Sequence, residues 1–524
     1  MLRTQLYANP EGIFLHNAIL DACRSFPNRI AIVDSSCTPH RRITYAEYGE
    51  MLEALARGFV AAGIRPGEVI AIWLANSWEF AVAYHAATLA GAIPTLLNPS
   101  YREREVRFQL ENSGAALLIA DGSTLKDVNL AGLPNLRRAY FTRTPAAGAE
   151  PFANLLQKQA AVLPAPDKSS QDTLAALPYS SGTTGLPKGV MLSHYNLVAN
   201  IYQLVGPNAA PITGEDCMLC FLPLYHIYGL TVGLNTMLLL GGTLVLMPRF
   251  QTQPLFALMV DESVTVMPTV PPVLNALSHS AAAGEFPKKH QLHWVKSGAA
   301  PLAPELARRF TELTGVIVNQ GYGMTEASPV THVGHCVGTM NRPWTIGQPL
   351  VATECRILDD AGDEVGADAP GELVMRGPQF MRGYWKEPQA TAAVLRDGWY
   401  WSGDVAVKSD DNFFQIVDRR KEMIKYKGFP IAPAEVEAVL MEHPAVRDCG
   451  VAGRPDLSAG ELPCAFIVLR DGQIASPALE QELGGWVAER LTGYKQPREF
   501  HFLDSIPRTP SGKILRRELR NRFA

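Results

Sequence analysis

The sequence predicts an α/β protein with a large N-terminal domain of mixed or parallel sheets and flanking helices, a small β-rich unit, and a small α+β C-terminal domain. Three observations support this. Strand and helix patterns alternate over the first 280 residues. Short strands between Gly and Asp turns follow residue 350. The last ~100 residues form a compact set of helices and strands.

The first half of the chain predicts a layered sheet. Apolar residues at helical spacing predict helices over residues 45–62 and 78–90, and short apolar runs predict strands over 69–74, 92–97 and 116–120. The same rhythm returns after residue 215, with strands over 218–222, 243–247 and 264–267 and helices over 229–240, 254–261 and 270–278. Such alternation favours parallel strands covered by helices on both faces.

The second half predicts two smaller units. Strands are expected over 354–358, 371–376 and 413–417, typical of a β-rich unit. A charged stretch, 418–428, precedes a final set of elements: helices 433–442 and 478–491 and strands 446–453 and 461–469. We place the domain boundary in the charged stretch, which divides the chain into residues 1–420 and 421–524.

Composition excludes several classes of protein. The 524 residues carry 47 Lys and Arg against 51 Asp and Glu, a formal charge of −4, which argues against a nucleic-acid partner. We therefore interpret the basic run Arg516–Arg522 as a solvated helix face. The uncharged stretch between His226 and Arg249 is divided by Gly241-Gly242, so it predicts a buried helix, turn and strand rather than a membrane span.

Cysteine usage and the N-terminus point to a cytoplasmic protein. Eight cysteines in 524 residues do not make a disulfide scaffold. The pair Cys217 and Cys220 lies in an apolar run and is interpreted as two core thiols. The N-terminus has no apolar stretch of signal-peptide length. No integral membrane contact is expected, and the oligomeric state is left open.

The strongest chemical signal is a loop rich in Gly, Ser and Thr, residues 177–189. Glycine allows close approach to a ligand, and backbone N–H groups, hydroxyls and Lys188 would surround a polyphosphate. It is not a Walker A loop, because Pro187 stands where that motif needs Gly. A flexible linker is disfavoured, since Pro187-Lys188-Gly189 leads directly into an apolar strand.

Three weaker signals follow along the chain. Thr325 and Glu326 offer hard oxygens suited to Mg²⁺ and phosphate, and Tyr322 offers an aromatic face for a purine. Asp404 is expected after a tight turn, where its carboxylate would accept ribose hydroxyls or cap a helix. Lys513 lies in a Gly turn and would by itself be interpreted as a surface lysine.

Together these motifs resemble the adenylate-forming superfamily: acyl- and aryl-CoA synthetases, luciferases and the adenylation domains of peptide synthetases. The resemblance covers essentially the whole chain, and the motifs stand in the family's order, at 180–189, 223–226, 297–301, 322–326, 401–404, 418–428 and 511–513. Within the superfamily the chain is most similar to 4-coumarate–CoA ligases, through residues 223–229, 295–302, 320–330 and 424–429. One departure is Pro430, where the plant enzymes carry Gln, and a proline cannot replace an amide side chain.

The resemblance implies two half-reactions and three small molecules. A carboxylic acid and ATP with Mg²⁺ would give an acyl-adenylate and pyrophosphate, and coenzyme A would then displace AMP. The catalytic residues implied are Lys513, His226, Lys425 and Thr325, and the implied metal ligands are Glu326 and Thr184. The ATP and AMP site implied comprises Ser180, Ser181, Gly182, Thr183, Thr184, Lys188, Ala299, Gln320, Gly321, Tyr322, Thr325, Asp404, Arg419, Lys421, Lys425 and Lys513.

The resemblance also implies an acid pocket and a CoA channel. The pocket would be lined by His226, Tyr228, Ala299, Gly321, Pro329 and Val330. Small residues along one wall would leave a flat slot, which favours a planar aryl or arylacrylic acid such as a hydroxycinnamate. CoA would contact Lys427, Gly428 and, less directly, Arg249. The small domain would rotate about Lys421 and replace Lys513 with Lys425 between the two steps.

Other functions share these motifs. The acceptor could be an amine or a carrier protein instead of CoA, the acid could be a medium- or long-chain fatty acid, and a luciferase-like oxygenase would use the same ATP site. A non-catalytic module is disfavoured, because both Lys513 and Lys425 are present.

Overall fold

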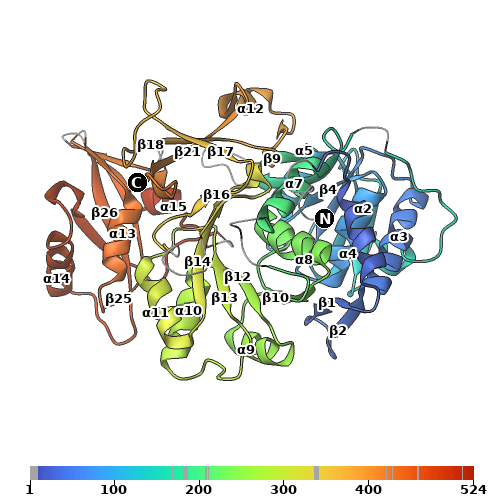
Figure 1. The fold of residues 1–524 in the computed structure, drawn as a ribbon, viewed down its shortest axis with the longest axis horizontal. Helices are drawn as coiled ribbons and strands as arrows, with labels where there is room; N and C mark the ends of the chain where they lie inside the picture. The colour runs from blue at the N-terminus through green and yellow to red at the C-terminus, as the bar shows by residue number, and fades with distance from the viewer. Residues whose placement is uncertain are drawn as a thin grey trace.

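The computed structural model describes most of the chain, in segments that leave out the extreme N-terminus and several loops. The segments described are residues 10–166, 169–180, 187–206, 209, 212–334, 342–419, 422–427, 429–456, 459–509 and 512–523. Four sheets and the helices that cover them account for this fold (Figure 1). Within the described residues, none of the helices has the length and apolar character needed to span a membrane.

A nine-stranded sheet forms the centre of the N-terminal part. Its order is β16-β15-β14-β13-β12-β10-β11-β1-β2, and the six strands from β14 to β1 run parallel. The carboxyl ends of β12, β13 and β14 therefore meet at one edge. The strands are β1 Ile30–Asp34, β2 Arg41–Thr44, β10 Cys217–Cys220, β11 Thr243–Leu246, β12 Val266–Thr269, β13 Trp294–Ser297, β14 Ile317–Gly323, β15 Val330–Val333 and β16 Gln348–Pro349.

A second, eight-stranded sheet is also largely parallel. Its order is β19-β9-β8-β4-β3-β5-β6-β7, with antiparallel pairing only at β9. The strands are β3 Val69–Trp73, β4 Ile93–Leu96, β5 Ala115–Asp121, β6 Arg138–Thr142, β7 Glu150–Pro151, β8 Leu174–Ser180, β9 Lys188–Ser193 and β19 Gly383–Tyr384. A short 3₁₀ turn, η1 Phe152–Asn154, follows β7.

Helices join the two sheets. α4 Trp78–Leu89 contacts β3 and β4, α8 Thr236–Leu240 contacts β11, and α2 Leu15–Ser25 contacts both helices. α4 is buried on every side except its last residue, as expected of a helix between two sheets. The other helices of this part are α3 Tyr45–Ala61, α5 Glu103–Ser113, α6 Gly122–Leu125, α7 His194–Leu204, α9 Thr252–Asp261, α10 Pro271–Ala282 and α11 Pro304–Thr314.

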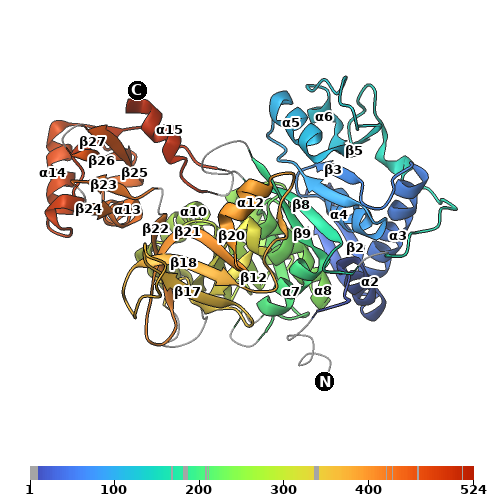
Figure 2. The same cartoon turned by 90° about the horizontal axis from the view of Figure 1, so that it is seen from above.

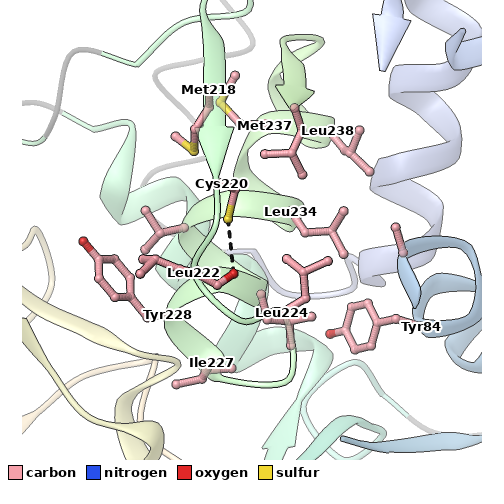
Figure 3. Close-up of a cluster of buried hydrophobic side chains, with 14 of the residues drawn as sticks. Tyr84, Met218, Cys220, Leu222, Leu224, Ile227, Tyr228, Leu234, Met237 and Leu238 are labelled. Carbon is pink, nitrogen blue, oxygen red and sulfur yellow. Dashed lines mark hydrogen bonds between the residues drawn. The ribbon is translucent and has the colours of Figure 1, made fainter. Parts of the chain in front are cut away.

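The uncharged stretch 226–249 is a buried helix, turn and strand, as predicted. The helix begins as a π-helix, η2 Tyr228–Asn235, and continues as α8. Gly241 ends it at φ +82°, a left-handed conformation that favours glycine, and β11 follows. Figure 3 shows this region packed in the core, with the Cys220 thiol donating to the Leu222 carbonyl oxygen at 3.5 Å. Of the two core thiols predicted, Cys220 is buried and Cys217 is partly buried against the core.

The β-rich unit is an antiparallel five-stranded sheet, β17-β18-β21-β20 with β22 on β21. Its strands are β17 Glu354–Leu358, β18 Gly371–Arg376, β20 Leu395–Arg396, β21 Trp399–Lys408 and β22 Phe414–Arg419, and α12 Pro388–Val394 precedes β20. The three strands predicted for this unit are present. β21 was not predicted as a strand.

The C-terminal elements form a fourth sheet, to one side of the rest in Figure 2. Its order is β24-β23-β26-β25, with β27 parallel to β26. α13 and α14 pack on one face and α15 on the other. The elements are β23 Ile424–Tyr426, β24 Phe429–Ile431, α13 Pro433–Met441, β25 Val446–Asp456, β26 Gly460–Leu469, α14 Pro477–Ala488, η5 Gly493–Lys495, β27 Glu499–Phe502, α15 Arg516–Arg520 and η6 Asn521–Phe523.

One surface prediction in this unit is wrong. Arg516, the first residue of the basic run, is buried rather than solvated. Its guanidinium pairs with Glu422 and Glu437, each at 2.8 Å, and donates to the Val451 carbonyl oxygen. A buried cation is stable only with such partners, so Arg516 joins α15 to α13 and β25. Arg517, the next residue, is exposed as predicted.

Candidate active site

The carboxyl edge of the nine-stranded sheet carries several of the predicted site residues. The amide of Gly298, just after β13, donates to the Thr269 carbonyl oxygen at the end of β12. Gln320 on β14 accepts from the Leu302 amide at 2.8 Å and donates to the Thr345 carbonyl oxygen at 3.0 Å. The Gln320 side chain therefore holds the loop after β13, which contains Ala299 at φ +66°.

Tyr322, Asp404 and Arg419, here called the Asp404 group, meet beside this edge. The Tyr322 hydroxyl donates to Asp404 Oδ2 at 2.5 Å, and Arg419 Nε lies 3.0 Å from Asp404 Oδ1. Burial, and then the Asp404 carboxylate, raise the pKa of Tyr322 well above its usual range. Three residues predicted for nucleotide binding thus come together from three strands.

The expected tight turn before Asp404 is wrong, and so is the helix-cap alternative. Residues 399–408 form one strand, and Asp404 pairs with Arg419 across the β21–β22 ladder. Gly403 has φ +69°, and the ladder shifts register after Val405, so the strand is irregular at this point. Gly403, which suggested a turn, instead marks an irregularity in the strand beside the carboxylate predicted to bind ribose.

Lys513 reaches this site from the C-terminal unit. The preceding residue, Gly512, lies close to the start of α10. A Cβ on Gly512 would lie 3.3 Å from the Pro272 ring. Burial lowers the pKa of Lys513 to about 8, with Arg419 acting in the same direction and Glu422 and Asp404 acting against it. Lys513 is therefore a partly buried group within electrostatic reach of the Asp404 group, and not the fully solvated surface lysine that its motif alone suggests.

Glu326 is buried in the short turn η3 Thr325–Ala327, directly after β14. Tyr384 on β19 donates to Glu326 Oε1 at 2.9 Å, and Lys188 Nζ lies 5.1 Å from the centre of the Tyr384 ring. Within the described residues no ion pair forms with Glu326. A buried carboxylate with a phenol as its partner fits Mg²⁺, which prefers hard oxygen ligands.

The phosphate loop is described only at its two ends. Ser180 at the end of β8 pairs with Lys188 at the start of β9. Ser181, Gly182, Thr183 and Thr184 lie outside the described residues. The predicted apolar strand after the loop is β9, which is largely buried.

The predicted acid pocket gathers around Tyr228. Its hydroxyl donates to the Lys296 carbonyl oxygen at 2.9 Å, and a Cβ on Gly298 would lie 3.0 Å from its ring. A Cβ on Gly321 would lie 3.6 Å from Lys296 Cδ. The buried stem of Lys296 thus passes along the wall that Gly321 leaves open.

Pro329 and Val330 close the end of the β14–β15 hairpin. A Cβ on Gly323 would lie 2.0 Å from the Pro329 carbonyl oxygen, so only glycine permits this close approach. Asn200 on α7 holds Val330 by two hydrogen bonds, at 2.7 and 3.0 Å. Both predicted lining residues therefore have rigid backbones.

His226 lies just before the π-helix. Its Nδ1 accepts from the Tyr228 amide at 3.3 Å, which leaves the proton of the neutral ring on Nε2. Burial lowers its pKa to about 4. His226 therefore offers a neutral N–H donor near neutral pH.

The residues predicted for the second half-reaction do not join the Asp404 group. Lys425 on β23 is exposed, and its amide donates to Glu461 at 2.8 Å. Lys427 is exposed with φ +50°, and Arg249 is exposed after β11. Lys421 and Gly428 lie outside the described residues. The structure therefore places Lys513, and not Lys425, beside the Asp404 group.

Two residues of the site were missed from the sequence. Tyr384 follows a glycine in an unremarkable loop, and only its contact with Glu326 reveals it. His332 on β15 packs edge-on against Tyr322, with ring centres 5.8 Å apart, and burial lowers its pKa to about 3. No spacing rule in the sequence distinguishes either residue from ordinary core or loop positions.

Comparison with known proteins identifies the family. Residues 19–385 match the model described as AMP-binding enzyme, and residues 435–513 match the model described as AMP-binding enzyme C-terminal domain. The chain belongs to the AMP-binding enzyme family. This membership confirms the resemblance and the fold class predicted from the sequence.

Individual members of the AMP-binding enzyme family are similar over the whole chain. The 4-coumarate–CoA ligase-like 9 of Oryza sativa subsp. japonica is 38% identical, covering 98% of this chain and 94% of its own. A crystal structure of an anthranilate CoA ligase in complex with anthranoyl-AMP superimposes with a TM-score of 0.88 at 25% identity, covering 97% of each chain. An o-succinylbenzoate coenzyme A synthetase of Bacillus subtilis, in complex with ATP and a magnesium ion, has a TM-score of 0.82 at 30% identity, covering 96% of this chain and 99% of its own.

Proposed function

We propose that this protein is an ATP-dependent, AMP-forming carboxylic acid–CoA ligase that acts on an aryl or arylacrylic acid. The observation that carries the proposal is Lys513, partly buried and close enough to Asp404 and Arg419 for both to influence its pKa. An ammonium held there, beside groups suited to a ribose, is placed to bridge a carboxylate and the α-phosphate of ATP.

In the first half-reaction a carboxylate oxygen forms a bond to the α-phosphorus, and the bond to the pyrophosphate oxygen breaks. The chain's contribution is positioning and charge neutralisation. Asp404 and Arg419 would hold the ribose hydroxyls, Thr325 the α-phosphate, and Ser180, Lys188 and the loop between them the outer phosphates. Mg²⁺ bound at Glu326 would neutralise phosphate charge as pyrophosphate leaves.

In the second half-reaction the CoA sulfur attacks the acyl carbon, the thiol proton is lost, and AMP departs with the electron pair of the acyl–phosphate bond. Lys425 and Lys427 face solvent in the present orientation, so we assign them to a rotated one. Strand pairing supports a division between residues 420 and 421: β22 ends at Arg419 in one sheet, and β23 begins at Ile424 in another.

The acid is inferred from the walls of the pocket. The Tyr228 ring lies against Gly298, and Gly321 leaves space beside the aliphatic stem of Lys296. A planar ring fits between flat walls and loses little conformational entropy on binding. A hydroxycinnamate therefore suits the pocket better than a long alkyl chain. We place this chemistry in the cytoplasm, where ATP and CoA are both available.

The test separates the two half-reactions. Wild type should exchange pyrophosphate into ATP with 4-coumarate and release 4-coumaroyl-CoA when CoA is added. Lys513→Ala should lose roughly 100-fold or more in exchange, because a charge that stabilises the transition state is removed. It should still convert a synthetic coumaroyl-adenylate to the thioester.

Lys425→Ala is the matched control and should show the reverse pattern, with exchange kept and thioester formation lost. Equal losses in both half-reactions for Lys513→Ala would overturn the assigned role. Transfer to hydroxylamine or a carrier protein but not to CoA would replace the ligase by an amide- or carrier-forming enzyme. A preference for dodecanoate over 4-coumarate would contradict the proposal that the acid is an aryl or arylacrylic acid.

A further inference from the structure

A second cluster of reactive side chains lies in the C-terminal sheet, away from the Asp404 group. β27 runs parallel to β26, with Cys464 opposite Glu499 and Phe466 opposite His501. Because side chains alternate along a strand, Cys464, Glu499 and His501 share one face. A thiol, a carboxylate and an imidazole are the three side-chain types that bind zinc.

The spacing of these groups matches a tetrahedral ion. Cys464 Sγ lies 3.5 Å from Glu499 Oε2, and His501 Nε2 lies 3.3 Å from the same oxygen. All three ligand atoms lie within 4.8 Å of one another. Bonds of about 2.3 Å to sulfur and about 2.0 Å to oxygen and nitrogen at tetrahedral angles separate such pairs by about 3.5 and about 3.3 Å. Two of the three pairs thus already have the spacing of a zinc site, and the third, Cys464 with His501, lies within 4.8 Å.

The surroundings leave a fourth position open. The His501 side chain is 40% exposed, and a cavity of ≈ 440 Å³ is lined by His501, Phe466 and Phe523. Phe466 stacks on the His501 ring at 5.1 Å and orients it. Water can therefore reach the cluster from one side while Cys464 remains buried.

The charges nearby are of both signs, because Arg454 interacts with both Glu499 and Cys464 and Arg522 lines the cavity. Arg454 donates to Glu499 Oε1 at 2.5 Å, which leaves Oε2 directed toward the other two groups. A carboxylate that shares its two oxygens between a metal and an outer hydrogen-bond donor is an ordinary arrangement in metal sites. With Cys464 as thiolate, two negative ligands face the ion.

We propose that Cys464, Glu499 and His501 form a zinc site with one open coordination position. The ion would join β27 to β26 at the edge of the C-terminal sheet. β27 leads through residues 503–512 to Lys513, so the site anchors the segment that carries this lysine. The proposal does not depend on the acid or the acceptor of the reaction.

The experiment uses the full chain, treated with a chelator and then titrated with Co²⁺ without nucleotide. Wild type should bind one equivalent with a thiolate-to-cobalt charge-transfer band in the near ultraviolet, and Zn²⁺ should displace it. Cys464→Ser should lack the band, and His501→Asn should bind cobalt roughly tenfold or more weakly. Cobalt bound only by oxygen ligands, such as the Glu326 carboxylate, gives no thiolate charge-transfer band.

Cys355→Ser is the matched control, because Cys355 Sγ also lies 3.5 Å from a histidine nitrogen, that of His332. It should keep the band. Zn²⁺ should also raise the melting temperature of wild type and leave that of Cys464→Ser unchanged. If Cys464→Ser does not fold, Glu499→Gln is used in its place, with the same cobalt titration and melting-temperature measurements. No band in wild type, a band that persists in Cys464→Ser, or one lost in Cys355→Ser would overturn the zinc site.

Discussion

Burial determines the charge of single residues in the site. It lowers the pKa of His226 to about 4 and that of Lys513 to about 8, and it raises the pKa of Tyr322. All three shifts favour the neutral form, as expected when water is removed from an ionisable group. Binding of the negatively charged phosphate and carboxylate groups is therefore expected to change the protonation of these three residues.

Lys513 gives a pH dependence with a definite sign. The proposed role needs its ammonium, and a pKa of about 8 means that this form is lost as pH rises through 8. We expect kcat/KM for ATP in pyrophosphate exchange to fall about tenfold per pH unit above that value, since kcat/KM reports the free enzyme. Lys513→Arg should remove the falling limb, because arginine stays charged. A flat profile up to about pH 10 would contradict this.

Gly321 tests the acid pocket. A Cβ there would lie 3.6 Å from Lys296 Cδ and 3.7 Å from the His332 carbonyl oxygen, which is ordinary contact. Gly321→Ala should therefore change kcat/KM for 4-coumarate by less than about threefold. Gly321→Leu should reduce it by roughly 100-fold, because its branched end must displace Lys296 or the acid. Steady-state kinetics with 4-coumarate, cinnamate, benzoate and hexanoate would measure both variants. If aryl acids are indifferent to Gly321→Leu, the pocket lies elsewhere.

Among the elements, those with clear periodicity were predicted well. The buried strands β3, β5, β10 and β11 and the helices α3, α4 and α13 fall within a few residues of their expected bounds. The strand that was not predicted and that carries Asp404 is β21. Its Gly403 interrupts the alternation of apolar and polar residues that identifies a strand. A glycine can mark either a turn or an irregularity within a strand, and the sequence alone does not distinguish the two.

One hydrogen bond from the C-terminal unit to α10 contributes to its present orientation. Arg470, after β26, donates to His279 Nε2 on α10 at 2.7 Å. His279 Nδ1 lies 2.7 Å from the Asn275 carbonyl oxygen, to which it donates, so Nε2 is an acceptor. This contact lies on the same helix that Gly512 approaches, and it supports the placement of Lys513.

Removing this contact should affect only adenylation. His279→Leu should lower kcat/KM for pyrophosphate exchange about fivefold, the equivalent of about 1 kcal/mol for one hydrogen bond. His279→Gln should restore most of it, because its amide oxygen can accept from Arg470. Thioester formation from synthetic coumaroyl-adenylate should be unchanged in both variants. A similar loss in both half-reactions would mean that His279 stabilises the fold generally.

At the scale of the whole molecule, two lysines cannot serve one site in one orientation. Lys513 lies at the Asp404 group while Lys425 faces solvent. The link between their sheets is short, from Arg419 to Ile424. A rotation about this link would exchange one lysine for the other, which separates two reactions that need different groups.

Lys421 is the predicted pivot. Lys421→Pro should restrict φ and hinder rotation, so pyrophosphate exchange should persist while overall 4-coumaroyl-CoA formation falls at least tenfold. Lys421→Ala is the matched control, because it removes the charge and keeps backbone freedom, and it should retain turnover. Unchanged turnover in Lys421→Pro, or an equal loss in Lys421→Ala, would show that the backbone at this position is not the hinge.

The sequence by itself determined the order of elements, the family motifs and the identity of Lys188, Glu326, Asp404 and Lys513 as chemical groups, because periodicity and motif spacing are local properties. Only the tertiary structure decided what surrounds those groups. It brings Tyr322 to Asp404 across 82 positions, leaves Lys513 only partly exposed, and pairs Tyr384 with Glu326. Burial and proximity arise from packing between distant segments, and no local pattern contains them.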